Sequence, residues 1–349
     1  MKKILGILGF AVLALTFQSC KKNSDNTPTP VTSKDTVFFA KGADISWLTQ
    51  MEASGIKFYD SAGTQQDCIE VLKGLGMNAI RLRAWVHPSA GWNNTSDVVA
   101  KAVRAKNMGM KILIDFHYSD TWADPGDQNK PAAWANLKFA DLKTALYNYT
   151  VGVMDTLKLN GITPTWVQVG NETDDGMLWP TGQVSKDSMA NYAALVAAGY
   201  SAVKLVSSST KVIVHLSDGY DNTHFTSLFN GLKANGASWD IIGLSLYPSY
   251  LSEGWSVGDS ECLANMNSLV AQYNTPVMVV EVGFPENNPT ASYNFLADII
   301  LKTKSVSQNQ GLGVLYWEPE SYNGWQGYGL GAFDDSGKPT AALNAFKGN

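Results

Sequence analysis

The stretch Thr165–Glu172, TWVQVGNE, is a mostly apolar run that ends in an asparagine and a glutamate. Short strands with apolar side chains on both faces are typical of a parallel sheet that helices cover on both sides. A second stretch, PVMVVEVGFP at 276–285, brings Glu281 close to the end of a similar run. Both stretches predict buried strands, and each carries an ionisable group to a place where such a group needs a partner or a function.

Runs of this kind recur along the whole chain, and segments with the three- and four-residue apolar spacing of helices separate them. Two of the helical segments lie at 68–75 and 192–203. The strand-like runs are KGADISW (41–47), NAIRLRAW (78–85), KILIDFH (111–117), TWVQVGN (165–171), KVIVHLS (211–217), IIGLSLY (241–247), PVMVVEV (276–282) and GLGVLYW (311–317).

Eight buried strands alternating with helices predict an α/β fold, a single (β/α)8 TIM barrel. An open doubly wound sheet is the competing architecture. The segment that would follow its first strand, GADIS at 42–46, is not a glycine-rich phosphate loop. The barrel is therefore the favoured interpretation, with one domain over 37–349.

The amino-acid composition indicates a globular protein and excludes some classes of partner. Of the 349 residues, 45% are hydrophobic and 16% are charged, which is enough to build a large core. The net charge is −5, and no cluster of lysine or arginine follows the extreme N-terminus, so a nucleic-acid partner is excluded. The eleven tryptophans and fourteen tyrosines supply flat amphipathic rings that suit sugar faces, although most aromatic side chains in any protein are core.

The N-terminal segment carries targeting signals. MKK and the apolar run 4–17 have the charged start and short hydrophobic centre of a secretory signal. FQSC at 17–20 resembles the site where bacterial lipoproteins are cleaved and acylated, with Phe17 in place of the favoured leucine. We expect a lipoprotein signal peptide at 1–20, a lipid on Cys20 and a flexible polar linker at 21–36. The protein is then exported and lipid-anchored to the cell envelope, at the cell surface, with no other membrane contact.

Only two cysteines follow Cys20. Cys68 and Cys262 lie far apart and lack the spacing of metal ligands, so we expect two buried free thiols.

Nearly every predicted strand ends in a side chain that can ionise, hydrogen-bond or stack. In a (β/α)8 barrel the carboxyl ends of the strands meet at one mouth, where the chemistry of such enzymes takes place. A single carboxylate there can equally be a helix cap or the partner of an arginine. The strand-end residues are Asp44, Trp47, Arg81 or Arg83, Trp85, Asp115, His117, Asn171, Glu172, His215, Asp218, Tyr247, Glu281, Trp317 and Glu318.

Two of these residues form a pair with a specific chemical use. Glu172 and Glu281 end the fourth and seventh strands, which lie across a barrel from each other. Hydrolysis of a glycosidic bond requires one carboxyl group that donates a proton and a second that stays ionised. The pair therefore fits a glycoside hydrolase, but the sequence does not give the separation that distinguishes retention from inversion.

Several motifs together resemble glycoside hydrolase family 53, the endo-β-1,4-galactanases. The longest is IDFHYSDTWADPGDQ at 114–128, and the resemblance covers 41 to about 346. The asparagine–glutamate on strand four and the glutamate on strand seven mark only the wider clan, whereas the strand-three motif is more restrictive. The other motifs are VQVGNE (167–172), SLYPSY (245–250), VVEVGFP (279–285) and LYWEPE (315–320).

The resemblance implies a retaining endo-hydrolase of β-1,4-galactan, with Glu172 as the acid/base and Glu281 as the nucleophile. It implies that Asn171 holds the 2-hydroxyl of the sugar and that Arg83 keeps the nucleophile ionised. A salt bridge of purely structural use is the alternative for Arg83.

The resemblance also supplies the remaining substrate-binding candidates. Tyr247 is expected to hydrogen-bond the nucleophile, and Trp317 to form the floor beneath the reacting sugar. The loop 118–128 is expected to shape subsites, as are the residues Asp44, Trp85, Asp115 and His117, and the rings of Trp47, Trp85, Trp122 and Trp179 are candidates for stacking on sugars.

The chain departs from the family pattern at two places. Leu246 and Tyr250 stand where many relatives carry an aromatic residue and a tryptophan. The segment after EVGFP is short and omits the longer stretch that carries calcium in some bacterial relatives, so no metal and no cofactor are predicted. A monomer is expected. Two alternatives stay open: another β-1,4-glycanase of the clan, such as a mannanase or cellulase, and a surface lipoprotein that binds glycan without cleaving it.

Overall fold

The computed structural model describes residues 38–348, which belong to one compact unit. The predicted signal peptide at 1–20, the lipidated Cys20 and the linker at 21–36 lie outside the described residues. The two remaining cysteines, Cys68 and Cys262, are buried free thiols, as predicted.

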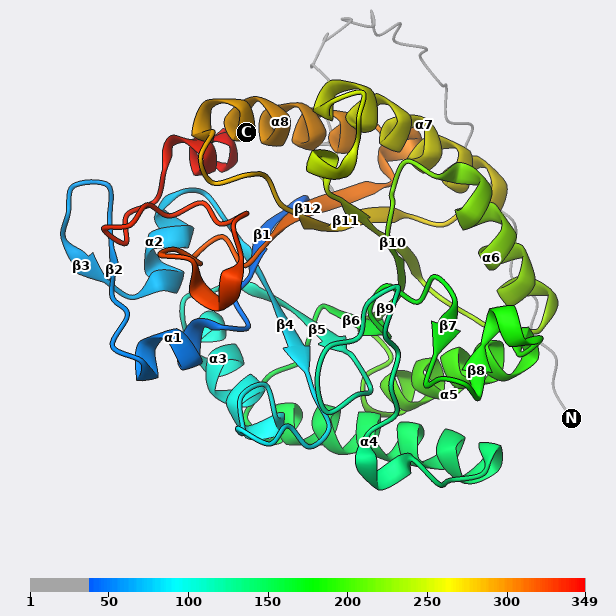
Figure 1. Cartoon of the computed structure of the whole chain (residues 1–349). Helices are drawn as coiled ribbons and strands as arrows, with labels where there is room; N and C mark the ends of the chain where they lie inside the picture. Colours follow the sequence, from blue (N-terminus) through cyan, green and yellow to red (C-terminus); the bar gives the residue numbers. More distant parts are fainter. Residues whose placement is uncertain (1–37, 349) are drawn as a thin grey trace, which may run out of the picture. The chain divides into compact units, whose positions relative to one another are not determined.

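Eight parallel strands close into a barrel, which confirms the predicted (β/α)8 fold (Figure 1). Each of the eight predicted runs coincides with one strand of the barrel, although β1 begins one residue before its run. Going round the barrel, the order is β1, β12, β11, β10, β9, β6, β5 and β4, so every neighbouring pair is parallel. The strands are β1 (Ala40–Asp44), β4 (Ala79–Ala84), β5 (Lys111–Phe116), β6 (Trp166–Val169), β9 (Lys211–Leu216), β10 (Ile241–Leu246), β11 (Val277–Val282) and β12 (Gly311–Trp317).

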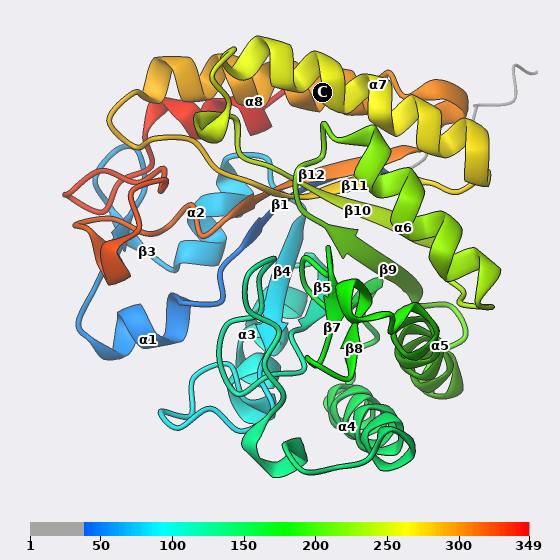
Figure 2. The ribbon, with the colours of Figure 1, turned by 45° about the vertical axis from the view of Figure 1, so that its right-hand side comes forward.

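Helices form the outer layer around the barrel (Figure 2). Side chains at their starts fix several of them: the Asp67 carboxylate accepts from the backbone N–H of Ile69, and Asn288 accepts from Ala291. The helices are α1 (Leu48–Ala53), α2 (Cys68–Gly74), α3 (Thr95–Asn107), α4 (Phe139–Leu159), α5 (Met189–Val206), α6 (Asn222–Ala234), α7 (Trp255–Tyr273) and α8 (Pro289–Lys304). The helix α5 is apolar and long enough to cross a membrane by composition alone, but it packs against α4 and α6 in this layer.

Short elements lie in the connections. Two hairpins pair β2 (Phe58–Tyr59) with β3 (Gln65–Gln66), and β7 (Gly176–Met177) with β8 (Gly182–Gln183). The second hairpin follows β6 directly and lies beyond the end of that strand. The 3-10 helices are η1 (Ala132–Trp134), η2 (Val184–Lys186), η3 (Pro248–Tyr250), η4 (Ser307–Asn309), η5 (Trp325–Gly327) and η6 (Ala341–Phe346).

The inside of the barrel is apolar at one end and polar at the other. The period of two along a strand places every second side chain inside. At the amino ends these side chains form a small separate core of Ala40, Ala79, Leu113, Trp166, Ile213, Ile241, Met278, Val280 and Leu315. Two or four residues further along the same strands come Asp44, Arg81, Asp115, Gln168, His215 and Ser245, all at most 1% exposed. The buried polar side chains therefore form a layer that packs against the apolar core inside the barrel.

An irregularity in β11 turns Glu281 into this polar layer. Leu244 of β10 pairs with Val279, whereas the next residue, Ser245, pairs with Glu281, so Val280 is an extra residue on β11. Such a bulge changes which side chains face inward from that point on. In a regular strand the next inward side chain after Val280 would be that of residue 282. Because of the bulge, the side chain of Glu281 faces the inside of the barrel instead.

Candidate active site

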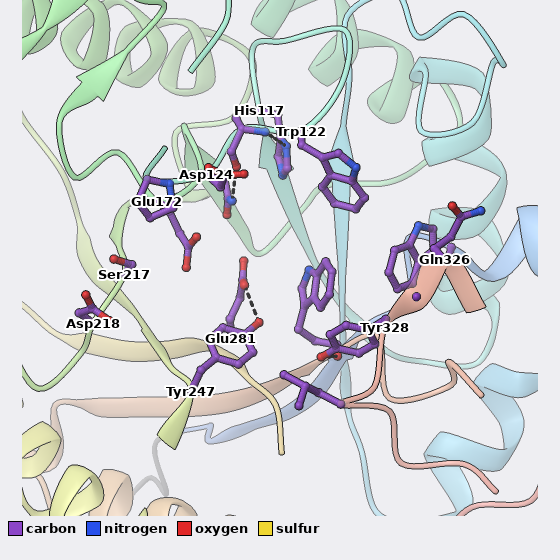
Figure 3. A pocket seen from close by; sticks show the side chains of 17 residues that line it. His117, Trp122, Asp124, Glu172, Ser217, Asp218, Tyr247, Glu281, Gln326 and Tyr328 are labelled. Carbon is purple, nitrogen blue, oxygen red and sulfur yellow. Dashed lines mark hydrogen bonds between the residues drawn. The ribbon is translucent and has the colours of Figure 1, made fainter. Parts of the chain in front are cut away.

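A cavity of about 640 Å³ opens at the carboxyl ends of the strands (Figure 3). Glu172, just after β6, and Glu281, on β11, point toward one another across it. The residues that line this cleft are Trp47, His117, Trp122, Ala123, Asp124, Pro125, Asn171, Glu172, Ser217, Asp218, Tyr247, Glu281, Trp317, Gln326, Gly327, Tyr328 and Leu330.

Glu172 lies in surroundings that favour its protonated form. Its backbone has a φ of 42°, a left-handed conformation that is strained for a residue with a side chain and that the surrounding structure must hold in place. Burial raises the pKa of the Glu172 carboxyl well above its ordinary value, and the charge of Glu281 raises it further.

Glu281 has partners that favour its ionised form. The guanidinium of Arg81 lies 2.7 Å from Glu281 Oε1, an ion pair without an aligned hydrogen bond, and the hydroxyl of Tyr247 donates to Oε2 at 2.9 Å. The pKa of Glu281 is raised to about 7, with burial as the largest cause, and Arg81 and Tyr247 act in the opposite direction. Because the cation contacts Glu281 and not Glu172, the negative charge of the pair belongs on Glu281 and the proton on Glu172.

Arg81 is the centre of the buried polar layer. Its Nη1 contacts Asp44 Oδ2 at 2.7 Å, and its Nη2 contacts Asp115 Oδ2 at 2.9 Å. The same Nη2 donates to Asn171 Oδ1 at 2.8 Å, and Nε donates to Gln168 Oε1 at 2.7 Å. Five buried groups thus hold one guanidinium in a fixed orientation beneath the cleft, with Glu281 as the fifth.

The role predicted for Arg83 is wrong, because Arg81 is the residue that contacts the nucleophile candidate. Arg83 forms an ion pair with Glu318 and lies under the ring of Trp122, 4.4 Å from its centroid. Residues 81 and 83 share the inner face of β4, about 6.5 Å apart along the strand. The period of two along the strand therefore predicts that both side chains point inward, but it does not predict which of them contacts the nucleophile candidate.

Three further candidates do not line the cleft, which corrects their predicted contact with substrate. Asp44 and Asp115 are fully buried and hold Arg81. Trp85 packs edge-on against Trp122, with centroids 5.2 Å apart, and its Nε1 donates to His117 Nδ1 at 3.2 Å. These residues support the site from behind.

Of the other candidates, four line the cleft as predicted: His117, Asn171, Tyr247 and Trp317. His117 is held by Asp115, whose Oδ2 lies 2.9 Å from its Nε2. Among the predicted stacking residues, Trp47 and Trp122 line the cleft and Trp179 does not.

Aromatic rings form one wall of the cleft. Trp317 packs edge-to-face against Trp47 and Tyr328, with centroids 5.2 and 4.8 Å apart. Trp122 lies 5.9 Å from both Trp47 and Trp317. Such rings present apolar faces that suit the C–H faces of a sugar.

Sequence reasoning did not assign several lining residues. Ser217 and Asp218 follow β9, while Gln326 and Tyr328 lie in the connection after β12. The strand-end rule selects Asp218 without giving it a role, and Ser217 is the last residue of the predicted run before it, whereas 326 and 328 are nine or more residues past the strand and carry no such signal. Among residues 38–348, no group of three His, Cys, Asp or Glu side chains is arranged to hold a metal ion.

Two facing carboxyl groups in an aromatic-lined cleft at the mouth of a (β/α)8 barrel are the architecture of a glycoside hydrolase. The chain belongs to glycoside hydrolase family 53, whose family model matches residues 40–346.

Named relatives and a solved structure agree with this family. The chain is 35% identical over 301 residues to a probable arabinogalactan endo-β-1,4-galactanase A of Neosartorya fischeri, covering 80% of this chain and 83% of that protein. It is 32% identical to an arabinogalactan endo-β-1,4-galactanase of Thermothelomyces thermophilus, covering 88% of this chain and 98% of that protein. A structure from a study of two fungal β-1,4-galactanases superposes with a TM-score of 0.82 at 30% identity, covering 88% of this chain and 98% of that chain.

Proposed function

We propose that this protein is a retaining endo-β-1,4-galactanase that cleaves the β-1,4-galactan of type I arabinogalactan and pectic side chains. Membership of family 53 and the names of the relatives support the substrate. The observation that carries the mechanism is the pair Glu172 and Glu281, which face each other with opposite electrostatic surroundings.

In the first step, Glu281 attacks the anomeric carbon of the bound galactosyl unit while Glu172 gives its proton to the departing glycosidic oxygen. The C–O bond to the leaving chain breaks, and an ester between Glu281 and the sugar forms. In the second step, Glu172 takes a proton from water, the water oxygen attacks the same carbon, and Glu281 leaves. Two inversions give net retention.

The charge of Glu281 couples the two steps. Before reaction this charge raises the pKa of Glu172 and keeps the proton available for donation. When Glu281 becomes an ester its charge is gone, so the pKa of Glu172 falls and the ionised Glu172 can act as a base. The same side chain is thus an acid first and a base second.

Asn171 has a donor left for the substrate. Its Oδ1 accepts from Arg81, and one hydrogen of Nδ2 goes to the carbonyl of Ala123 at 2.8 Å. The amide carries a second hydrogen on Nδ2. Since Asn171 lines the cleft, this hydrogen is the donor that we assign to the sugar's 2-hydroxyl.

The test is product release from defined polysaccharides. Purified protein incubated with galactan, mannan, xylan and cellulose should release reducing ends rapidly from galactan alone. Preferred cleavage of mannan or cellulose would assign the protein to a different β-1,4-glycanase. Binding of galactan without any release would make it a glycan-binding lipoprotein.

We also propose that the protein is exported, carries a lipid on Cys20 and acts at the cell surface as a monomer. The support for export and for the lipid is the sequence of the first 36 residues. Cys20→Ala should move the protein from the membrane fraction to the soluble fraction. An unchanged membrane fraction would contradict the anchor.

A further inference from the structure

A buried histidine lies directly beneath the acid/base candidate. His215, on β9, is fully buried, and its Nδ1 lies 3.3 Å from the backbone nitrogen of Glu172. Its Nε2 lies 2.8 Å from Ser245 Oγ on the neighbouring strand β10. Neither His215 nor Ser245 lines the cleft, so neither contacts substrate.

The surroundings of His215 determine which of its nitrogens carries the hydrogen. Arg81 Nε can only donate, so Gln168 presents Oε1 to Arg81 and Nε2 to Nδ1 of His215, at 3.0 Å. The backbone N–H of Glu172 also donates to Nδ1. Asn171 Oδ1 lies 3.1 Å from Nδ1, but it accepts its hydrogen bond from Arg81 Nη2 and not from His215.

Two donors aimed at Nδ1 make this nitrogen an acceptor, and the hydrogen of a neutral imidazole then belongs to Nε2. Burial, with the charge of Arg81 as a second cause, lowers the pKa of His215 well below its ordinary value, so the ring is neutral. Nε2–H therefore donates to Ser245 Oγ. The hydroxyl of Ser245, with that lone pair occupied, keeps its own hydrogen for donation, and it lowers the pKa of Glu172 as a hydrogen-bond donor to that carboxyl group.

We propose that His215 and Ser245 are positioning residues for the acid/base. They are the last links of a chain of donors that runs from Arg81 through Gln168, His215 and Ser245 to Glu172. A hydrogen bond from Ser245 engages one oxygen of the Glu172 carboxyl group, and the other oxygen can then carry the proton for the glycosidic oxygen. Arg81 thereby orients both catalytic carboxyl groups, Glu281 by direct contact and Glu172 through three side chains. This inference rests on the proposed function.

The charge around Glu172 gives the chain a measurable consequence. Glu281 and Asp174 raise the pKa of Glu172, whereas Arg81 and the Ser245 hydroxyl lower it. Tyr247 also faces Glu172, as a neutral phenol whose pKa is raised well above its ordinary value. Because the acid must be protonated, activity falls as pH rises through the pKa of Glu172. Loss of the Ser245 hydrogen bond must raise this pKa and move the alkaline limb upward.

The experiment is the pH dependence of kcat/KM on a galactan oligosaccharide for wild type, Ser245→Ala and Ser245→Thr. Ser245→Ala should move the alkaline limb upward by about one to two pH units, which is the effect of one hydrogen bond to a charged group. Ser245→Thr keeps the hydroxyl and should keep the limb of wild type. Ser292→Ala, a buried serine on α8, is the matched control and should leave the profile unchanged.

A second pair of variants tests the link to His215. His215→Leu removes the donor to Ser245 and should also raise the alkaline limb, whereas His215→Gln places a donor near the former Nε2 and should restore it. An aryl galactobioside with a good leaving group needs little acid catalysis, so its cleavage at neutral pH should not change in Ser245→Ala.

Two outcomes would overturn the inference: an unchanged alkaline limb in folded Ser245→Ala and His215→Leu, or equal losses of rate on both substrates. If wild type does not cleave galactan at all, the proposed function fails instead, and the two failures are thereby distinguished.

Discussion

Tyr247→Phe removes one hydrogen bond to the ionised Glu281 and leaves the rest of the side chain in place. The hydroxyl donates to Glu281 Oε2 at 2.9 Å, and burial keeps the phenol protonated by raising its pKa well above its ordinary value. A hydrogen bond to a charged group contributes about 1.5 to 3 kcal/mol. Since about 1.4 kcal/mol corresponds to one pH unit, the pKa of Glu281 should rise by about one to two units.

This change has a definite sign and size in the rate. Glu281 must be ionised to attack, so the acidic limb of kcat/KM follows its pKa, which lies at about 7 in wild type. Raising this pKa lowers the ionised fraction at pH 7 from about one half to between about one tenth and one hundredth. We therefore expect kcat/KM at pH 7 to fall about 5- to 50-fold, with most of the loss recovered at higher pH.

The assay is the pH profile of kcat/KM on a galactan oligosaccharide, measured beside Tyr322→Phe. Tyr322 is also buried and hydrogen-bonded, to the carbonyl of Lys57, but does not line the cleft, so this control should keep the profile of wild type. An acidic limb that stays in place or moves to lower pH in Tyr247→Phe would refute the electrostatic account of Glu281.

Glu172→Gln should lower kcat on galactan by roughly 10² to 10⁴, and much less on aryl glycosides with good leaving groups; equal losses on both would contradict its role as an acid. Arg81→Met leaves the carboxylates of Asp44 and Asp115 buried without their cation, so urea denaturation should show a loss of about 3 to 5 kcal/mol in the free energy of unfolding. An undiminished stability would mean that these carboxyl groups are protonated. Trp122→Ala removes a ring from the cleft wall and should raise KM for galactan oligosaccharides more than it lowers kcat, and an unchanged KM would remove that ring from substrate binding.

The barrel could be predicted because its strands are buried on both faces. An apolar run such as 276–282 carries the same signal wherever helices cover both sides of a sheet. The positions of Glu172 and Glu281 at the mouth followed from the same pattern, since a strand that ends in a carboxylate places it where the strands converge.

The partners of these carboxyl groups could not be predicted in the same way. Arg81 and Arg83 share one face of β4, and only the packed structure shows that Arg81 reaches Glu281 while Arg83 pairs with Glu318. The extra residue Val280 in β11 shifts the register by one, and nothing in PVMVVEV marks it. The link from His215 to Ser245 joins two strands through side chains, so it depends on a pairing that periodicity does not specify.

In the proposed mechanism, Glu281 forms a covalent bond to the sugar. A β-galactobioside with fluorine in place of the 2-hydroxyl and a good leaving group should form this ester faster than it breaks down. Digestion of the treated protein and mass spectrometry of its peptides should then place the added fluorosugar on the peptide that contains Glu281. A label on any other carboxylate, or no label together with a product of inverted configuration, would contradict the account.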